Sequence, residues 1–241
     1  MIVLLTDFGP GEYVGVMKAV IYSIDNSART VDLCHDISPQ CIVEGSWILK
    51  CNYKYFPEGS TFCCVVDPGV GTERKAIAVK TERFYFVGPD NGLLWEALQD
   101  QKIVTIRQMN VPPGASRTFH GRDVFAKAAA KISIGGFDEL GEELPEMEKL
   151  ELYQNGREGT VVRIDGFGNV ITNLPRENKE EYTVRIGRNR YRMGYYPEYH
   201  SANEDDLFLI EGSNNTLEIS LRNGSANDRL RLRAGARISI V

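Results

Sequence analysis

Short apolar runs separated by amphipathic stretches fill the first part of the chain. Apolar runs lie at 1–6, 30–34 and 62–66, and the last of these consists of small and β-branched residues typical of a strand buried on both faces. The segments 12–24 and 42–56 lie between the runs and have the spacing of helices. The apolar positions that carry the spacing of the first helix are Val14, Met17, Ile21 and Ile24.

This alternation of strands and helices predicts an α/β domain with a mostly parallel sheet flanked by helices. Further strands are expected at 76–80, 84–87 and 102–107, with a short helix at 93–98. An Ala-rich helix follows Asp123, which we expect to act as its first-turn acid or N-cap.

The pattern changes in the last third of the chain. Residues 137–148 are strongly acidic and poor in pattern, which indicates a linker or a surface excursion. After residue 155 the alternation has period two, with Gly and Asn turns and no convincing helix, so we expect a smaller all-β barrel or sandwich. The sequence predicts domains at 1–150 and 156–241. The expected strands are 160–164, 170–174, 182–186, 207–210, 217–221 and 237–241.

Composition narrows the classes of function. Of 241 residues, 42% are hydrophobic and 25% charged, as in ordinary globular proteins. The net charge of −5 argues against a nucleic-acid partner. No apolar stretch approaches the ~20 residues of a membrane span, and residues 1–8 lack the basic region and cleavage site of a signal peptide. We therefore expect a cytoplasmic protein with neither nucleic acid nor membrane as partner.

The five cysteines all lie in the first third of the chain. Their number is odd and no C-x-x-C pair occurs, so neither a disulfide framework nor a zinc site is indicated. Buried free thiols in a reducing compartment explain them better. These residues are Cys34, Cys41, Cys51, Cys63 and Cys64.

Polar residues follow several of the expected strands. Asp7, the His-Asp pair at 35–36 and Asp67 end three of them, and the loops at 90–91 and 120–123 add more. Each residue alone reads most simply as a cap or turn acid. If the strands are parallel, however, the first three converge on one edge of the sheet, where such folds bind ligands. A divalent metal site would need several of these carboxylates with His ligands at compatible geometry.

Five motifs support a family resemblance over essentially the whole chain. They are T-D-F-G at 6–9, D-P-G-V-G-T-x-R at 67–74, P-D-N-G at 89–92, F-H-G-R-D at 119–123 and D-G-F-G-N-V-x-T-N at 165–173. With these motifs in this order, the chain resembles the S-adenosyl-L-methionine (SAM) hydroxide adenosyltransferase family, which also contains the SAM-dependent fluorinase and chlorinase.

The resemblance implies an α/β domain, a β domain and a homotrimer that binds SAM between neighbouring subunits. It also implies nucleophilic substitution at C5′ of SAM with release of methionine, without a metal or other cofactor. The nucleophile is halide in the halogenases and water or hydroxide in the hydrolytic branch, whose product is adenosine.

Two positions separate the branches. Halogenases of the family carry Tyr where this chain has Asp67, and Tyr-Ser where it has His120-Gly121. A carboxylate would repel an incoming halide, and Gly121 lacks a hydroxyl donor. The Asp-Arg-His set of the hydrolytic branch falls on Asp67, Arg74 and His120, which makes SAM hydrolysis the leading hypothesis.

These residue types suit the chemistry. The sulfonium departs as a neutral thioether, so no general acid is required, and the difficulty lies in orienting and deprotonating water. Arg74 can hold Asp67 in place and ionised. Whether Asp67 or His120 takes the proton stays open.

The resemblance also implies substrate contacts. Asp7 matches the acid on the ribose diol, Asp165 a residue on the methionine ammonium, Asn169 one that reads the adenine edge, and Phe167 an aromatic near the base. Gln40 replaces a Trp of the halogenases, and Lys127 replaces a common Pro. The match to methionine-carboxylate and adenine contacts in the last part of the chain is looser and covers Ser213, Asn214, Arg222, Ser225 and Ala226.

Three alternatives remain at this point. A halogenase would form 5′-halo-adenosine in high-halide buffer. A non-catalytic SAM or adenosine sensor would bind without turnover, and the changes at Gln40 and Lys127 favour it. A metal-dependent hydrolase, suggested by the acidic strand ends, would lose activity in EDTA.

Overall fold

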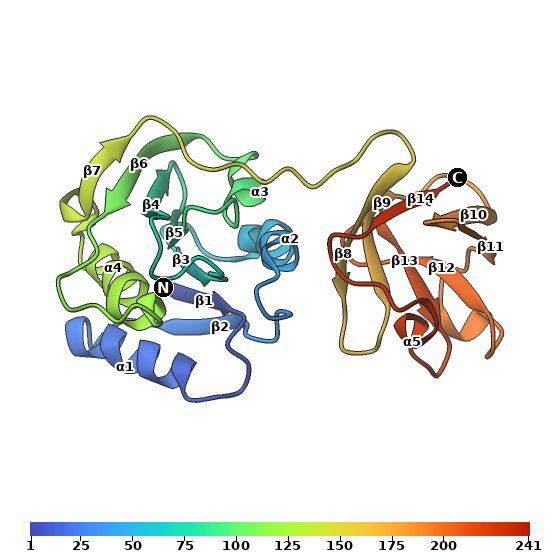
Figure 1. Cartoon of the computed structure of the whole chain (residues 1–241), viewed down its shortest axis with the longest axis horizontal. Coiled ribbons are helices and arrows are strands. Elements are labelled where there is room, and N and C mark those ends of the chain that lie inside the picture. The colour runs from blue at the N-terminus through green and yellow to red at the C-terminus, as the bar shows by residue number, and fades with distance from the viewer. The chain divides into compact units, whose positions relative to one another are not determined.

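Two compact units make up the chain, and each builds its own sheet (Figure 1). The computed structural model describes all 241 residues, with unit 1 at Met1–Glu151 and unit 2 at Leu152–Val241. Unit 1 is α/β and unit 2 is built on an antiparallel sheet, so the predicted fold class is confirmed.

The sheet of unit 1 has seven strands in the order β2-β1-β3-β5-β4-β6-β7. The pairs β2–β1, β1–β3 and β3–β5 are parallel, whereas β5–β4, β4–β6 and β6–β7 are antiparallel. The sheet is therefore mixed, not mostly parallel as predicted. The connection from β4 to β5 is a tight turn, and a parallel pair would need a much longer crossover. The strands are β1 (Ile2–Thr6), β2 (Thr30–Cys34), β3 (Thr61–Val65), β4 (Ala76–Thr81), β5 (Tyr85–Pro89), β6 (Ile103–Met109) and β7 (Gly141–Leu144).

Helices cover both faces of this sheet (Figure 1). On one face of the sheet, Ile2 and Leu4 of β1 pack with helices α1 and α4. On the other face, Val3 and Leu5 pack with α2 and α3. β3 is likewise buried along its whole length, which confirms a strand covered on both faces. The helices are α1 (Tyr13–Ile24), α2 (Ile42–Asn52), α3 (Trp95–Leu98) and α4 (Ala126–Ser133), with 3₁₀ turns η1 (Tyr53–Tyr55) and η3 (Phe137–Glu139).

The acidic segment 137–148 is not the linker that its composition suggests. It contains η3 and then β7, which pairs with β6 at the edge of the sheet. Arg107 of β6 donates to Asp138 and to its register partner Glu143, both over 3.2 Å. An edge strand needs charged side chains more than apolar ones, so composition alone conceals it.

A π-helical turn, η2 (Gly121–Phe125), leads into α4. Asp123 lies in the first turn of η2, as predicted for an early helix acid, but it is not an N-cap. Its carboxylate instead accepts a hydrogen bond from Ser116 N over 2.8 Å and pairs with Arg122, which lowers its pKa to about 2.

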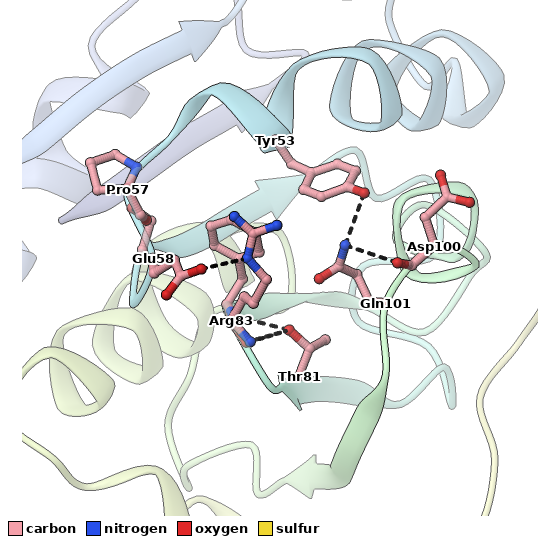
Figure 2. A network of polar contacts seen from close by, with 9 residues as sticks. Tyr53, Pro57, Glu58, Thr81, Arg83, Asp100 and Gln101 are labelled. Atoms are coloured by element: carbon pink, nitrogen blue, oxygen red, sulfur yellow. Dashed lines mark hydrogen bonds and ion pairs between the residues drawn. The ribbon is translucent and has the colours of Figure 1, made fainter.

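Polar contacts join the loops at the edge of the sheet where β3 and β5 begin (Figure 2). Arg83 donates from Nε to Glu58 over 2.7 Å, and Gln101 donates to the hydroxyl of Tyr53 over 2.9 Å. The side chains of the Arg83–Glu58 pair are 51% and 69% exposed, so the pair contributes only about 0–1 kcal/mol. This edge is opposite the carboxyl ends of the parallel strands, where the acidic motifs lie.

Unit 2 is a seven-stranded antiparallel sheet in the order β11-β10-β14-β8-β9-β13-β12. A bridge between Tyr195 and Leu209 brings its two ends together, so the sheet forms a nearly closed barrel around an apolar core. The sequence did not predict β11, nor the short helix α5. The elements are β8 (Glu158–Ile164), β9 (Val170–Pro175), β10 (Glu181–Ile186), β11 (Asn189–Gly194), η4 (Tyr199–Ser201), β12 (Leu207–Glu211), β13 (Thr216–Leu221), α5 (Ala226–Leu230) and β14 (Arg237–Ile240).

All five cysteines are free thiols, as expected. Cys51, Cys63 and Cys64 are buried, and burial raises the pKa of Cys63 to about 12. Cys34 and Cys41 are only half-buried. None of the helices combines the length and the apolar character that crossing a bilayer demands.

Candidate active site

Asp67 lies directly beyond the carboxyl end of β3. The turn that follows it packs closely against the segment before His120. A methyl group on Gly71 would lie only 2.4 Å from the carbonyl oxygen of Arg117. Gly71 also has a φ of +76°, so the turn requires glycine there. This tight turn brings Arg74 back beside Asp67.

Arg74 and Asp67 form a buried, two-pronged ion pair. Arg74 donates from Nε to Oδ1 of Asp67 over 2.8 Å and from Nη2 to Oδ2. The two side chains are 10% and 5% exposed, and the guanidinium lies 5.2 Å from the ring centre of Phe125. The fork geometry fixes both oxygens of the carboxylate.

His120 joins this pair through the same guanidinium. Arg74 Nη2 donates to Nδ1 of His120 over 2.9 Å. Because a guanidinium can only donate, Nδ1 is the acceptor, and the proton of the neutral ring sits on Nε2. Burial and the positive charge of Arg74 lower the pKa of His120, which keeps the imidazole neutral.

Asp67 and His120 line one cavity of about 310 Å³ with Asp7. Asp7 follows β1, and its Oδ2 accepts a hydrogen bond from the backbone N–H of Gln40 over 2.7 Å. Burial raises the pKa of Asp7, and the nearby charge of Asp67 adds to this effect. The remaining lining residues are Phe8, Tyr13, Pro39, Gln40, Val65, Val70, Thr118, Phe119 and Gly121.

Three aromatic rings form one side of this cavity. Phe8, Tyr13 and Phe119 pack with ring centres 5.1–5.8 Å apart. A methyl group on Gly121 would lie 3.1–3.2 Å from carbon atoms of Phe8 and Phe119. A serine there would therefore press on both rings, so this packing favours glycine.

The other strand-end residues have structural partners outside the cavity. His35 pairs through Nδ1 with the hydroxyl of Thr6 over 2.8 Å and lies 3.1 Å from Asp32. Asp90 accepts a hydrogen bond from Glu148 N over 2.7 Å. No three His, Cys, Asp or Glu side chains are arranged to hold a metal ion. The converging set in unit 1 is thus Asp7, Asp67 and His120, with Arg74 behind them.

Asp165 organises a loop in unit 2. Its Oδ1 accepts hydrogen bonds from the backbone N–H groups of Phe167 and Asn169 over 3.0 and 2.8 Å, and its Oδ2 accepts from Asn169 Nδ2 over 2.9 Å. Phe167 stands at the tip with 82% of its surface exposed. The hydrogen bonds to Asp165 thus hold the loop that carries the Phe167 ring.

Phe167, Asn169 and Arg222 line a second cavity, of about 630 Å³. The other residues predicted to bind substrate in unit 2 do not line it. Ser225 is the N-cap of α5, where its Oγ accepts from Asp228 N over 3.0 Å, and Ala226 is fully buried. Ser213 is exposed and Asn214 half-buried in the turn between β12 and β13. The rest of the lining is Tyr199, His200, Leu221, Asn223 and Gly224.

Sequence reasoning missed two residues of unit 2. Tyr199 lines the second cavity from η4, in a segment that matched no motif. Glu218 lies within β13 and is buried, and burial beside Asp165 raises its pKa to about 7. The alternation of residues 217–221 would place Glu218 on a solvent face, so no sequence signal marked it.

Comparison with known proteins finds matches to one family in both units. The SAM hydroxide adenosyltransferase N-terminal domain matches residues 2–141, and the C-terminal domain of that family matches residues 159–239. The (R)-S-adenosyl-L-methionine hydrolase of Methanocaldococcus jannaschii is 42% identical over 195 residues, covering 77% of this chain and 70% of that protein. The protein of the same name from Thermus thermophilus is 36% identical over 253 residues, covering 98% of both.

A solved structure supports the same assignment. The crystal structure of an uncharacterized conserved protein from Thermotoga maritima superposes with a TM-score of 0.91 at 34% identity, covering 100% of both chains. Sequence and fold therefore point to the same set of proteins.

Proposed function

This chain belongs to the SAM hydroxide adenosyltransferase family, and we propose that it hydrolyses SAM to adenosine and L-methionine with Asp67, Arg74 and His120 as its catalytic group. The observation that carries the proposal is the buried network in which one guanidinium fixes both the carboxylate and the imidazole. Relatives at 36% and 42% identity are named SAM hydrolases, which supports the same reaction.

The reaction forms one bond and breaks one. The oxygen of water attacks C5′ of SAM while the C5′–sulfur bond breaks, and its electron pair goes to sulfur. Methionine leaves as a neutral thioether, so the protein has only to orient the water and accept its proton.

The tautomer of His120 divides these two tasks. With Nδ1 accepting from Arg74, the Nε2–H group can donate a hydrogen bond but cannot accept a proton. Each oxygen of Asp67 retains a lone pair beyond its bond to Arg74. We therefore assign proton acceptance to Asp67 and orientation of the water to His120.

Asp7 suits the ribose end of the substrate. Its carboxylate is held at Oδ2 by the N–H of Gln40 and borders the same cavity as Asp67. A carboxylate can accept a hydrogen bond from each hydroxyl of a ribose diol, which would orient C5′ toward Asp67.

Hydrolysis fits this cavity better than halogenation. Asp67 would repel a halide, and the rings of Phe8 and Phe119 leave little room for a hydroxyl-bearing side chain at position 121. Incubation in high chloride or fluoride should therefore give adenosine and no 5′-halo-adenosine.

The proposal extends to assembly, cofactor and compartment. Of the predicted substrate contacts, Asp7 lines a cavity of unit 1, and Phe167, Asn169 and Arg222 line a cavity of unit 2. We propose that a homotrimer joins such cavities from neighbouring subunits. The network acts without a metal, so EDTA should leave turnover unchanged. Five free thiols are consistent with work in the reducing cytoplasm.

The test is incubation of the purified protein with SAM, with adenosine followed by chromatography. Asp67→Asn keeps the shape but removes the proton acceptor, and it should lower kcat by at least about a hundredfold. Asp100→Asn, an exposed acid at the opposite edge of the sheet, is the matched control and should retain activity. Tight adenosine binding without turnover in the unaltered protein would favour a sensor and refute the proposal.

A further inference from the structure

Strand β13 carries a polar face that is buried. Thr216, Glu218 and Ser220 point to one side and are 7%, 7% and 0% exposed, whereas Leu217 and Ile219 point into the core of the barrel. A buried row of polar side chains is costly unless something satisfies it.

Glu218 is the most costly member of this row. Its register partners on both neighbouring strands are isoleucines, Ile171 on β9 and Ile210 on β12. The carboxylate also lies against Gly212, where a methyl group would come within 1.7 Å of its Oε1. Burial in these surroundings and the nearby Asp165 both raise the pKa of Glu218, to about 7.

No positively charged group near Glu218 pairs with its carboxylate. Asp165 lies within electrostatic reach, and so does Tyr199, whose pKa is raised by burial and by Glu218. Arg222 is engaged elsewhere, since it donates from Nη1 to the carbonyl of Ala202 over 3.3 Å and faces Glu204. Arg163 lies two strands away as the register partner of Ile171. None of these cations lowers the pKa of Glu218.

A second polar atom on this face lacks a partner. Oγ1 of Thr216 is buried and makes no hydrogen bond, although it lies two residues from Glu218 on the same side of the strand. An unsatisfied hydroxyl beside an unpaired carboxylate is expected where a ligand with several donors completes the site.

We propose that Glu218 supplies a second carboxylate to the ammonium group of the amino-acid part of the substrate, beside Asp165, which the family resemblance already places there. Glu218 is thereby a specificity-determining residue. This inference rests on the proposed hydrolysis of SAM. Asp165 already accepts three hydrogen bonds from its own loop, so the unpaired carboxylate of Glu218 supplies the free acceptor and the second negative charge. Nucleosides that lack an ammonium gain nothing from Glu218.

The proposal predicts proton release on binding. A bound ammonium favours the ionised form of Glu218, so at pH 6 the carboxyl group gives up its proton when the ligand binds. S-adenosylhomocysteine is a suitable probe, because it retains the ammonium but lacks the reactive sulfonium. Adenosine is the control ligand without the ammonium.

Titration calorimetry in buffers of different ionisation enthalpy measures both the affinity of each ligand and the number of protons released on binding. Glu218→Gln should weaken S-adenosylhomocysteine about 10- to 100-fold, abolish proton release and leave adenosine affinity within about twofold. Glu211→Gln, an exposed acid at the end of β12, should change neither ligand. Equal weakening of both ligands by Glu218→Gln, or no proton release by the unaltered protein, would overturn the inference.

Measurements of stability and turnover show whether the Glu218→Gln variant folds, and whether a negative result refutes the role of Glu218 or the proposed hydrolysis. The pKa of Glu218 is higher in the folded chain than the ordinary 4.5, so the unfolding free energy falls as pH rises from 4.5 through 7. Glu218→Gln should remove this loss and raise Tm at pH 8 but not at pH 4.5, which also shows that the variant folds. Adenosine formation from SAM with an unchanged KM in Glu218→Gln would refute the inference and leave the proposed function intact, whereas no adenosine from the unaltered protein would refute the function.

Discussion

At the scale of residues, the chemistry depends on what Arg74 does to its two neighbours. One guanidinium ion-pairs with Asp67 and bonds to the acceptor nitrogen of His120. It thereby fixes both oxygens of the carboxylate and keeps the imidazole neutral, as a hydrogen-bond donor at Nε2.

The pH dependence of turnover should reflect this arrangement. Protonation of Nδ1 would break the bond from Arg74 and place two positive charges side by side. Because the pKa of His120 is lowered from the ordinary 6.5, kcat/KM should fall only below that pH. The measurement is the pH–rate profile of adenosine formation, and a rise in activity below pH 6.5 would contradict the assigned tautomer.

The lowered pKa of His120 also makes the folded protein less stable at acidic pH. Below pH 6.5 the unfolded chain takes up a proton on this histidine before the folded chain does, so the unfolding free energy falls as pH falls. Urea unfolding of His120→Gln at a series of pH values should lack this contribution. His200→Gln alters a side chain that is 77% exposed and serves as the control.

At the scale of elements, tight turns and edge strands decide where side chains go. The turn after β3 needs glycine at position 71 to pack against Arg117, and this contact holds the Asp67 segment beside the segment that leads to His120. Edge strands such as β7 and β11 remain rich in exposed charge, so the chain can build them without the apolar pattern that reveals inner strands.

Helix α1 allows a matched test of packing. Ile21 is fully buried between the sheet and α4, whereas Ile24, at the same expected helical face, is 41% exposed in the last turn. Ile21→Ala should lower the unfolding free energy by about 2–5 kcal/mol, and Ile24→Ala by less than about 1 kcal/mol. Urea denaturation measures both losses, and equal losses would contradict the burial of Ile21 against α4.

At the scale of the whole molecule, each unit carries its own part of the expected site. Asp7, Asp67 and His120 line the cavity of unit 1, whereas Phe167, Asn169 and Arg222 line the cavity of unit 2. If a trimer joins cavities from neighbouring subunits, two inactive variants should complement each other.

The variants for this test are Asp67→Asn in unit 1 and Asn169→Ala in unit 2. If each site draws its two parts from different subunits, every mixed trimer has one intact site of its three, so a randomly reassembled 1:1 mixture should recover roughly one-quarter of full activity. Light scattering should give three times 27.0 kDa. No recovery in demonstrably mixed assemblies would show that each site belongs to a single subunit.

The sequence by itself determined the fold class, the position of Asp67 after a buried strand and the family. These depend on local periodicity and on contiguous motifs, which the chain order displays directly. Most inner strands and helices lie where the pattern predicts them, because burial on one or both faces imposes that pattern.

Only the tertiary structure decided the rest. The antiparallel half of the first sheet, the tautomer of His120 and the buried Glu218 depend on groups far apart in the chain. Glu218 reads as a solvent-facing residue in an alternating strand, but it is buried, with its carboxylate against Gly212 and isoleucines as its register partners on both neighbouring strands. Periodicity reports which side of a strand a residue faces, whereas long-range packing determines what covers that side.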